Sequence, residues 1–352
     1  MSPRPPRRST PSTDSLVIVS GKIMLTVVLY GFCYLATPVI VFSQLDNNDT
    51  TQSNSNPNHD KSLSKVVILT FDGGHKSQYI NAKPVLDKYG FKATFYVVCD
   101  YTQKGGDTRM NWTEVRELYK QGHDIGSNTM NHYRLTDLPT EKMEYEVSVS
   151  EQCLLDQGIN TTSFAYPYNS GASTSAVVNK VAEHYYLARS SGSPLMFLDC
   201  NRPGNEDNET STIDLNSNLS NSQKPTDCRP YSQGQDDNNS MKTVHRYSIR
   251  GWSHEEERKE NEYNDSQMLQ RFIEVVNSQS KYNQNGTINA IPIVIYQKVE
   301  TDSKDNDFSG AANNELFDAE MNYLHDNGFI VLTISDLTYD QTSHTLQTRD
   351  NI

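Results

Sequence analysis

The chain has 352 residues, enough for one large domain or two small ones, but its hydrophobic content of 35% is low for a protein that is globular throughout. Part of it is therefore expected to lie outside a folded core. The formal net charge is −13, although the first 22 residues hold four basic residues and one acidic residue. So acidic a chain argues against nucleic acid as a partner.

The basic tail, residues 1–22, is followed by an apolar segment, residues 23–42, which contains no charged side chain. This arrangement is typical of either a cleaved signal peptide or a signal anchor. The upstream basic residues favour an anchor whose amino terminus stays inside the cell. Either alternative exports the rest of the chain, as a membrane-anchored extracellular domain or as a secreted protein. Residues 43–64 are rich in Asn, Ser, Thr and Asp and are expected to form a disordered linker.

Four cysteines follow the apolar segment, and export makes disulfides plausible among them: Cys99, Cys153, Cys200 and Cys228. Four cysteines allow three pairings. We favour Cys200 with Cys228, because that bond would close the base of a long polar stretch, residues 201–241. Cys99 would then pair with Cys153.

From Lys65 onward, apolar runs of strand length alternate with helical patterns, which predicts a parallel α/β architecture. The predicted strands are Val66–Phe71, Ala93–Val98, Asp124–Ser127, Ser163–Tyr166, Tyr186–Arg189, Thr243–Ile249, Ile291–Tyr296 and Phe329–Thr333. Eight strands suit a barrel. We place this domain at residues 65–340, with a polar insertion at 201–241 and a tail at 341–352.

Two helices have clear sequence signals. The first is expected to begin after Asn111, which has the spacing of a capping box with Glu114, and to stop at Gly122. The second is expected over Ser266–Val276, where apolar residues recur at helical spacing.

Asp72 directly follows the first predicted strand, within the motif Thr70-Phe71-Asp72-Gly73-Gly74. The motif puts a carboxylate at the mouth of a barrel, where barrel enzymes keep their catalytic residues. With the stretch from Ile125 to His132, this motif resembles the NodB-type polysaccharide deacetylases, carbohydrate esterase family four. The resemblance covers approximately residues 65–200 and 241–340. It implies an α/β fold of the deformed (β/α) barrel type and the metal-dependent hydrolysis of acetamide C–N bonds on N-acetylated glycans.

The resemblance also assigns the metal site. Asp72 keeps the position of the general base, but Gly73 stands where the family has a metal-binding Asp. Asn128 stands in place of the first ligand His, and only His132 is retained. The family implies a divalent, zinc-like metal, and one imidazole is too few ligands to hold it firmly, so binding should be weak or absent.

The remaining motifs are also altered. Ala165-Tyr166-Pro167-Tyr168 matches Arg-x-Pro-Tyr without the arginine that orients the base, while Pro167 and Tyr168 remain for substrate and the Tyr168 amide for the oxyanion. Gln297 replaces the general-acid His and cannot titrate. Trp252 corresponds to the family's aromatic wall, although packing in the core is the more common role of such a residue.

Simpler interpretations stand beside these assignments. Asp72 could cap the next helix or shape a tight turn. Tyr168 could serve only in packing, and His132 could equally be a surface histidine. His75 lies three residues beyond Asp72, so Asp72, His75 and His132 could form a displaced metal site. A solvent-facing loop histidine is the favoured interpretation of His75.

Three functions remain open for the exported domain. It could hydrolyse N-acetyl groups slowly, bind glycan without turnover, or act as a cell-envelope interaction protein through residues 201–241. The loss of two metal ligands and of the general acid favours the glycan-binding pseudoenzyme. The partners expected are a polysaccharide or glycan and, through residues 23–42, the membrane. The sequence does not indicate an oligomeric state.

Overall fold

A computed structural model describes residues 65–199, 246–284, 286–301 and 311–349, together with the backbone of 228–230 and 242–244. The predictions for the basic tail, the apolar segment, the linker and most of the polar insertion fall outside these residues. Within the described part of the chain, no helix has the length and apolar character needed to cross a bilayer.

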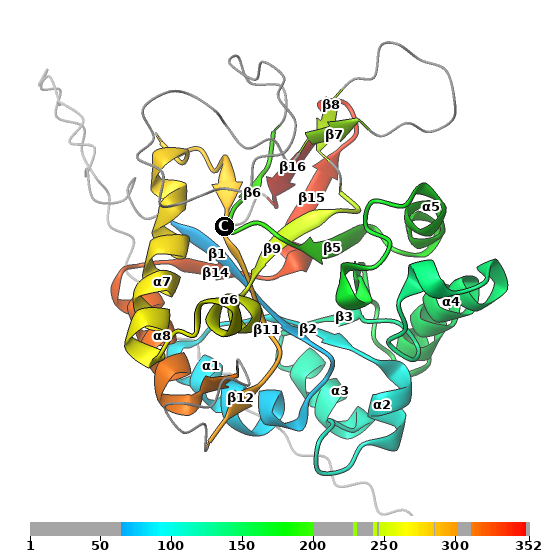
Figure 1. Cartoon of the computed structure of the whole chain (residues 1–352), viewed down its shortest axis with the longest axis horizontal. Helices are drawn as coiled ribbons and strands as arrows, with labels where there is room; N and C mark the ends of the chain where they lie inside the picture. Colours follow the sequence, from blue (N-terminus) through cyan, green and yellow to red (C-terminus); the bar gives the residue numbers. More distant parts are fainter. Residues whose placement is uncertain are drawn as a thin grey trace, which may run out of the picture. The chain divides into compact units, whose positions relative to one another are not determined.

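Parallel strands close into a barrel, as the sequence predicts (Figure 1). In the described part of the chain the main sheet has eight strands, β1 (Val66–Asp72), β2 (Thr94–Val97), β3 (Asp124–Ser127), β4 (Ser163–Ala165), β5 (Leu187–Ser191), β9 (Ile249–Ser253), β11 (Ile293–Tyr296) and β14 (Ile330–Leu332). The ring runs from β1 through β2, β3, β4, β5 and β9 to β11, and β11 pairs with β1 again. This is the deformed (β/α) barrel.

The deformation lies beside β1. One edge of β1 pairs with β11 along Ile68–Phe71. The opposite edge is shared, because Val66–Ile68 pair with β14 and Thr70–Asp72 pair with β2. The last strand of the barrel therefore fills the gap between β1 and β2 at the amino ends of the strands, and seven strands form the carboxyl end.

The two faces of β1 show which side chains enter the barrel. Val66 and Ile68 belong to an apolar cluster with residues from β2, β4, β5, β9, β11 and β14, which is the interior. The intervening residues Val67, Leu69 and Phe71 pack outward against the helices. Because side chains alternate along a strand, Asp72 continues the interior series and lies where the barrel opens.

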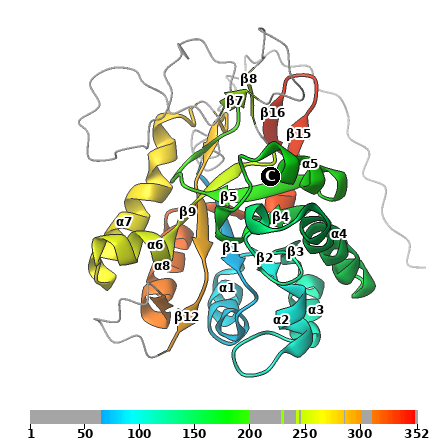
Figure 2. The ribbon, with the colours of Figure 1, turned by 45° about the vertical axis from the view of Figure 1, so that its right-hand side comes forward.

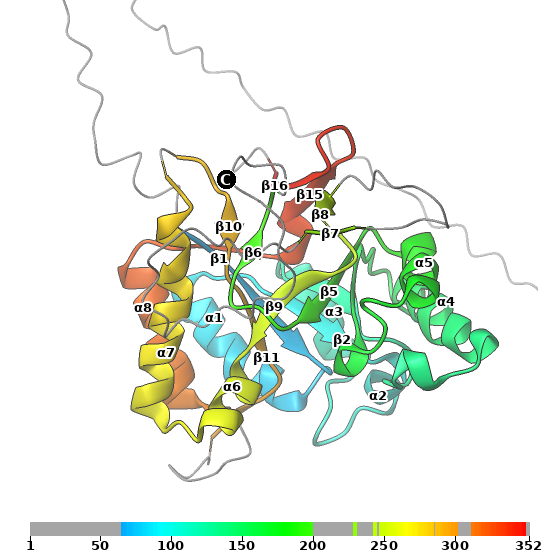
Figure 3. The same ribbon diagram turned by 45° about the horizontal axis from the view of Figure 1, so that its top comes forward.

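Helices cover the outside of the barrel (Figure 1). They are α1 (Lys83–Tyr89), α2 (Cys99–Lys104), α3 (Trp112–Lys120), α4 (Thr140–Asp156), α5 (Ser175–His184), α6 (His254–Asn261), α7 (Asp265–Asn277) and α8 (Asn314–Asp326). Figure 2 shows α7 beside α8, and Figure 3 shows α4 beside α5. Asn111 and Glu114 form the predicted capping box of α3.

Shorter elements join these parts. Five helical turns lie at Gln78–Ala82, Leu135–Asp137, Pro167–Asn169, Ser278–Lys281 and Ile334–Asp336 within the described residues. Small two-stranded sheets pair β6 (Met196–Phe197) with β10 (Ala290–Ile291), β7 (Cys228–Pro230) with β8 (Lys242–Val244), β12 (Val299–Glu300) with β13 (Ala312–Asn313), and β15 (Leu337–Asp340) with β16 (Thr345–Thr348).

Several predicted boundaries differ from the structure. The strand predicted over Ile291–Tyr296 is divided, because Ile291 belongs to β10 and the barrel strand β11 begins at Ile293. The strand predicted over Thr243–Ile249 is divided, because a turn at 246–248 separates β8 from the barrel strand β9. The predicted tail at 341–352 is in part the second strand of a hairpin, and Leu346 packs against the apolar interior with 2% of its surface exposed. The burial of this one side chain anchors a segment that looks too polar to fold.

Candidate active site at the barrel rim

Asp72 is held by an arginine that the sequence analysis did not identify. Arg189 Nη2 donates to Asp72 Oδ1 across the barrel. The Arg189 side chain is 2% exposed, and its guanidinium lies over the ring of Tyr96 at 5.0 Å. Arg189 on β5 is the register partner of Ala165 on β4. The family motif has its orienting arginine at the position of Ala165, on β4. In this chain the arginine that orients Asp72 lies on the neighbouring strand, β5.

The sequence signal for Arg189 is its position within the alternation of inward and outward side chains along the strand. It lies two residues beyond Leu187, whose side chain packs in the barrel interior. A charged residue on the inward face of a buried strand needs a partner of opposite charge. In this barrel Asp72 is that partner.

Gly73 faces a second guanidinium. Its backbone has a left-handed φ of 83°, and a Cβ added there would lie 3.1 Å from Arg109 Nη1 and 3.2 Å from His75 Nε2. Arg109 Nη1 donates to the Gly73 carbonyl at 2.6 Å. Gly73 therefore has no side chain at the position where the family carries a ligand carboxylate, and the positively charged Arg109 guanidinium lies against its backbone.

His75 is part of this arrangement. Its Nε2 lies 3.2 Å from Arg109 Nη1 and accepts that hydrogen bond when the ring proton is on Nδ1. Burial, together with the positive charges of Arg109 and Lys298, lowers the pKa of His75 to about 3. His75 is consequently neutral at physiological pH and adds no charge to the rim.

His132 lies on a tightly folded loop after β3. Thr129 and His132 both have left-handed φ angles, 71° and 63°. The Ser127 hydroxyl accepts from the Thr129 amide at 3.1 Å, and the Thr129 hydroxyl accepts from the His132 amide at 2.8 Å. The buried Glu146 carboxylate accepts from both the amide and the side chain of Asn131, at 2.7 Å each. These bonds hold a backbone conformation that is unfavourable for residues other than glycine.

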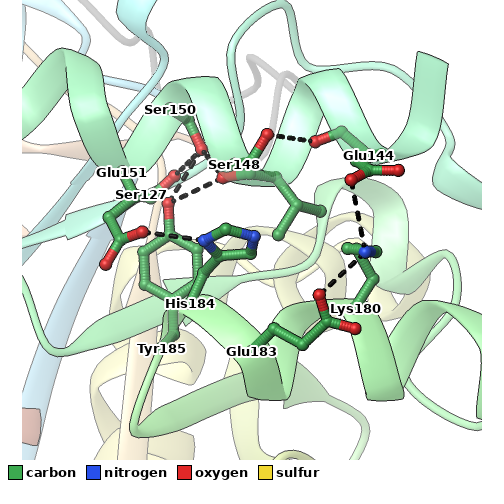
Figure 4. Close-up of polar contacts among 10 residues, drawn as sticks. Ser127, Glu144, Ser148, Ser150, Glu151, Lys180, Glu183, His184 and Tyr185 are labelled. Carbon is green, nitrogen blue, oxygen red and sulfur yellow. Dashed lines mark hydrogen bonds and ion pairs between the residues drawn. The ribbon is translucent and has the colours of Figure 1, made fainter. Parts of the chain in front are cut away.

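Further hydrogen bonds tie this loop to its helices. Ser127 Oγ lies 2.8 Å from Ser150 Oγ on α4, which lies 2.8 Å from the hydroxyl of Tyr185 (Figure 4). Figure 4 also shows His184 Nδ1 against Glu151 Oε2, at 2.8 Å, where α5 meets α4. Burial raises the pKa of Tyr185, so its hydroxyl remains protonated.

The disulfide between Cys99 and Cys153 fastens the same region. It joins the start of α2 to α4, and the Cys99 amide donates to the Thr129 carbonyl at 3.2 Å. The predicted pairing of these two cysteines is thereby confirmed. The Cys200–Cys228 pairing involves side chains outside the described residues and stays a prediction.

An aromatic row crosses the rim at His132. The His132 ring lies 4.7 Å from that of Tyr168 and 6.3 Å from that of Tyr101. An arginine guanidinium lies over each tyrosine ring. The distance from guanidinium carbon to ring centroid is 4.5 Å for Arg109 over Tyr101 and 4.8 Å for Arg134 over Tyr168. Tyr168 is 58% exposed, so its ring is available to a ligand.

A part of the chain that contains most of this site is similar in sequence to known proteins. Residues 59–187 match the model of the polysaccharide deacetylase family. This part of the chain, a little over a third of its length, is therefore similar to the polysaccharide deacetylase domain. The chain is 32% identical over 109 residues to the provisionally named polysaccharide deacetylase YxkH of Bacillus subtilis, covering 30% of this chain and 38% of YxkH. It is 31% identical over 84 residues to a peptidoglycan-N-acetylglucosamine deacetylase of Bacillus cereus, covering 24% of this chain and 37% of the relative. The chain thus spans less than two fifths of either relative.

Among solved structures, the family 4 carbohydrate esterase from Streptomyces lividans in complex with acetate is similar, with a TM-score of 0.44 and 13% identity. That match covers 81% of this chain and 98% of the esterase.

Several expected deacetylase positions have structural roles instead. Asn128 is 1% exposed, and its Nδ2 donates to the Ala165 carbonyl at 2.9 Å, which ties β3 to β4. Pro167 is buried and shapes the turn after β4, so it offers no surface to substrate. Trp252 is also not a wall of the site. It is one residue out of phase with the inward face of β9, is 4% exposed in the outer core, and donates to Glu257 at 3.0 Å.

Gln297 directly follows β11; its side chain is exposed, and its backbone forms the contacts to its neighbours. Gln78 Nε2 donates to the carbonyls of both Asp72 and Gln297 at 2.6 Å, linking the ends of β1 and β11. The Gln297 amide donates to Glu255 Oε1 at 3.1 Å. The segment is thus fixed beside Asp72, although the side chain cannot transfer a proton.

The donor set at the rim does not fit the family's divalent metal. Within the described residues, no three His, Cys, Asp or Glu side chains lie together so that they could hold an ion. The displaced site suggested for Asp72, His75 and His132 is therefore not formed. Asp72 is engaged by Arg189, and His75 lies against Arg109, whose charge repels a cation.

Glu255 is a buried carboxyl beside the rim. Its Oε1 accepts from the amides of Gln297 and Lys298, and burial raises its pKa from 4.5 to about 7. A raised pKa in the folded state stabilises the protein at low pH, and that contribution is lost as pH rises through about 7.

We expect Glu255→Gln, which keeps the acceptor oxygen, to remove this dependence. The drop in free energy of unfolding between pH 5 and pH 8 should be about 2–3 kcal/mol smaller in the variant than in the parent. Chemical denaturation at the two pH values measures the difference. Equal drops would show that Glu255 is already ionised at pH 5.

Proposed function

We propose that the chain binds an N-acetylated glycan at the barrel rim and does not hydrolyse its acetamide by the metal-dependent route. The observation that carries this proposal is the Arg109 guanidinium at Gly73, where a metal ligand would stand. The glycan class comes from relatives named as polysaccharide and peptidoglycan deacetylases. The exposed Tyr168 ring beside His132 supplies an aromatic face for a sugar.

The chemistry that remains is incomplete. A bound metal would lower the pKa of its water from about 15.7 to about 7 and polarise the acetamide oxygen. Asp72 is positioned to accept a proton from a water, but the described residues offer no set of ligands that would hold a metal to activate that water. Gln297 cannot protonate the departing amine. Ligand binding therefore survives these substitutions better than turnover does.

We also propose that this binding takes place outside the cell. The apolar segment at 23–42 supports export, by anchor or by secretion. The Cys99–Cys153 disulfide supports an oxidising compartment.

Acetate release and glycan binding, measured on one preparation, test the proposal. With chitotetraose we expect binding by calorimetry and no acetate release above the enzyme-free control, whether Zn²⁺, Co²⁺ or Mg²⁺ is added. Tyr168→Ala should weaken binding about tenfold, because a sugar loses its stacking face. Metal-stimulated release that EDTA abolishes would contradict the proposal.

The intact Asp72–Arg189 pair favours one second candidate, slow hydrolysis without a metal. In that case acetate release would be insensitive to EDTA and absent from Asp72→Asn. The same assay distinguishes the two functions.

A further inference from the structure

The rim carries positive charge that no carboxylate of the described residues pairs with. Asp72 is paired with Arg189, whereas neither Arg109 nor Arg134 forms an ion pair with a carboxylate of the described residues. The protein as a whole has a formal net charge of −13. Two unpaired guanidinium groups beside one site therefore reverse the local sign of the charge.

We propose that Arg109 replaces the metal ion as the fixed positive charge of this site and that it receives the carboxylate of an acidic, N-acetylated sugar. This inference rests on the glycan binding proposed above and adds the class of sugar. A planar guanidinium binds carboxylates through paired N–H donors, and it is charged at any physiological pH.

Arg109 is held in a defined position. Nη1 donates to the Gly73 carbonyl at 2.6 Å and meets neutral His75 at 3.2 Å, while the guanidinium plane lies on Tyr101. Gly73 leaves the room for this contact, because a Cβ there would lie only 3.1 Å from Nη1. The absence of a side chain at Gly73 and the position of the Arg109 guanidinium therefore depend on each other.

The nearby carboxylates of the described residues form their hydrogen bonds and ion pairs with groups other than Arg109 and Arg134. Glu146 accepts both hydrogen bonds of Asn131. Asp100, on α2, pairs with Lys104 at 2.5 Å. The aromatic row between Arg109 and Arg134 would contact the faces of the sugar ring, while the arginines contact its acidic substituent.

A matched pair of ligands tests the proposal. The first is a tetrasaccharide of alternating N-acetylglucosamine and N-acetylmuramic acid, whose lactyl groups carry carboxylates, and the second is its methyl ester. We expect the parent protein to bind the acid about tenfold more tightly than the ester, the value of one charge-assisted hydrogen bond. EDTA should leave this ratio unchanged. A third titration with sodium acetate shows whether a free carboxylate suffices.

Arg109→Ala should bind the acid and the ester with equal affinity, and a cooperative unfolding transition shows that the variant is folded. Lys120→Ala, which removes an exposed positive charge at the end of α3, should keep the tenfold ratio. The proposal is overturned if the parent binds both forms equally, if EDTA removes the preference, or if Arg109→Ala retains it. If the parent binds the acid and the ester equally, the proposed glycan binding stands and only the inference about acidic sugars fails. If it binds acetate but neither tetrasaccharide, both proposals fail.

Discussion

Asp72→Ala should destabilise the fold by about 3–5 kcal/mol, because it leaves the Arg189 guanidinium buried without a counter-charge. The Arg189 side chain is 2% exposed, and its Nε lacks a hydrogen-bond partner in the described structure. Arg189→Met should cost less, about 1–3 kcal/mol, since the Asp72 side chain is 22% exposed and water can solvate it. Guanidinium chloride denaturation of both variants measures the asymmetry.

The double variant Asp72→Leu with Arg189→Met is the control. Replacing both members of a buried pair by apolar groups removes the desolvation cost together with the attraction, so this protein should be more stable than Asp72→Ala. If Asp72→Ala is the milder of the two single changes, the buried pair does not dominate the energetics of the rim. The result also matters for activity assays, since a lost signal in an Asp72 variant can reflect unfolding.

Removing the Cys99–Cys153 disulfide should lower the free energy of unfolding by about 4 kcal/mol in the chain-entropy model, given the sequence separation of 54. Cys153→Ser is the preferred variant, because Cys153 is only partly buried whereas Cys99 is in the core. We expect the loop from Thr129 to His132 to lose protection against hydrogen exchange first, since the Cys99 amide donates to it.

A reducing agent provides the matched control for this prediction. Reduction should weaken the parent protein by about as much as Cys153→Ser and should leave the variant unchanged. If the variant and the parent unfold at the same denaturant concentration, the bond adds nothing that the surrounding packing does not already supply.

The barrel could be predicted because its signals are local. Apolar runs mark β1, β2 and β11, and the capping box of Asn111 with Glu114 marks the start of α3. The place of Asp72 follows from strand phase, since it ends a run whose alternate residues face inward. The Cys99–Cys153 pair followed from the favoured pairing of the other two cysteines, and the structure bears it out.

The arginines could not be predicted in the same way. Arg189 meets Asp72 across the interior, and Arg109 reaches Gly73 from a distant loop, so neither contact leaves a pattern in the neighbouring sequence. Trp252 packs in the core, the role more common for such a residue, and not at the sugar site. Its direction depends on the phase of β9, which begins at Ile249, whereas the predicted strand ends there.

The closure of β1 by β11 on one edge and by β14 on the other has a consequence for synthesis on the ribosome. The first strand of the domain emerges early, but its partners are among the last segments to be translated. Until they appear, its hydrogen-bonding edges and apolar side chains stay incompletely covered. Such distant pairings slow folding and leave a nascent chain prone to association. A truncation that ends before β11 should therefore accumulate in aggregates.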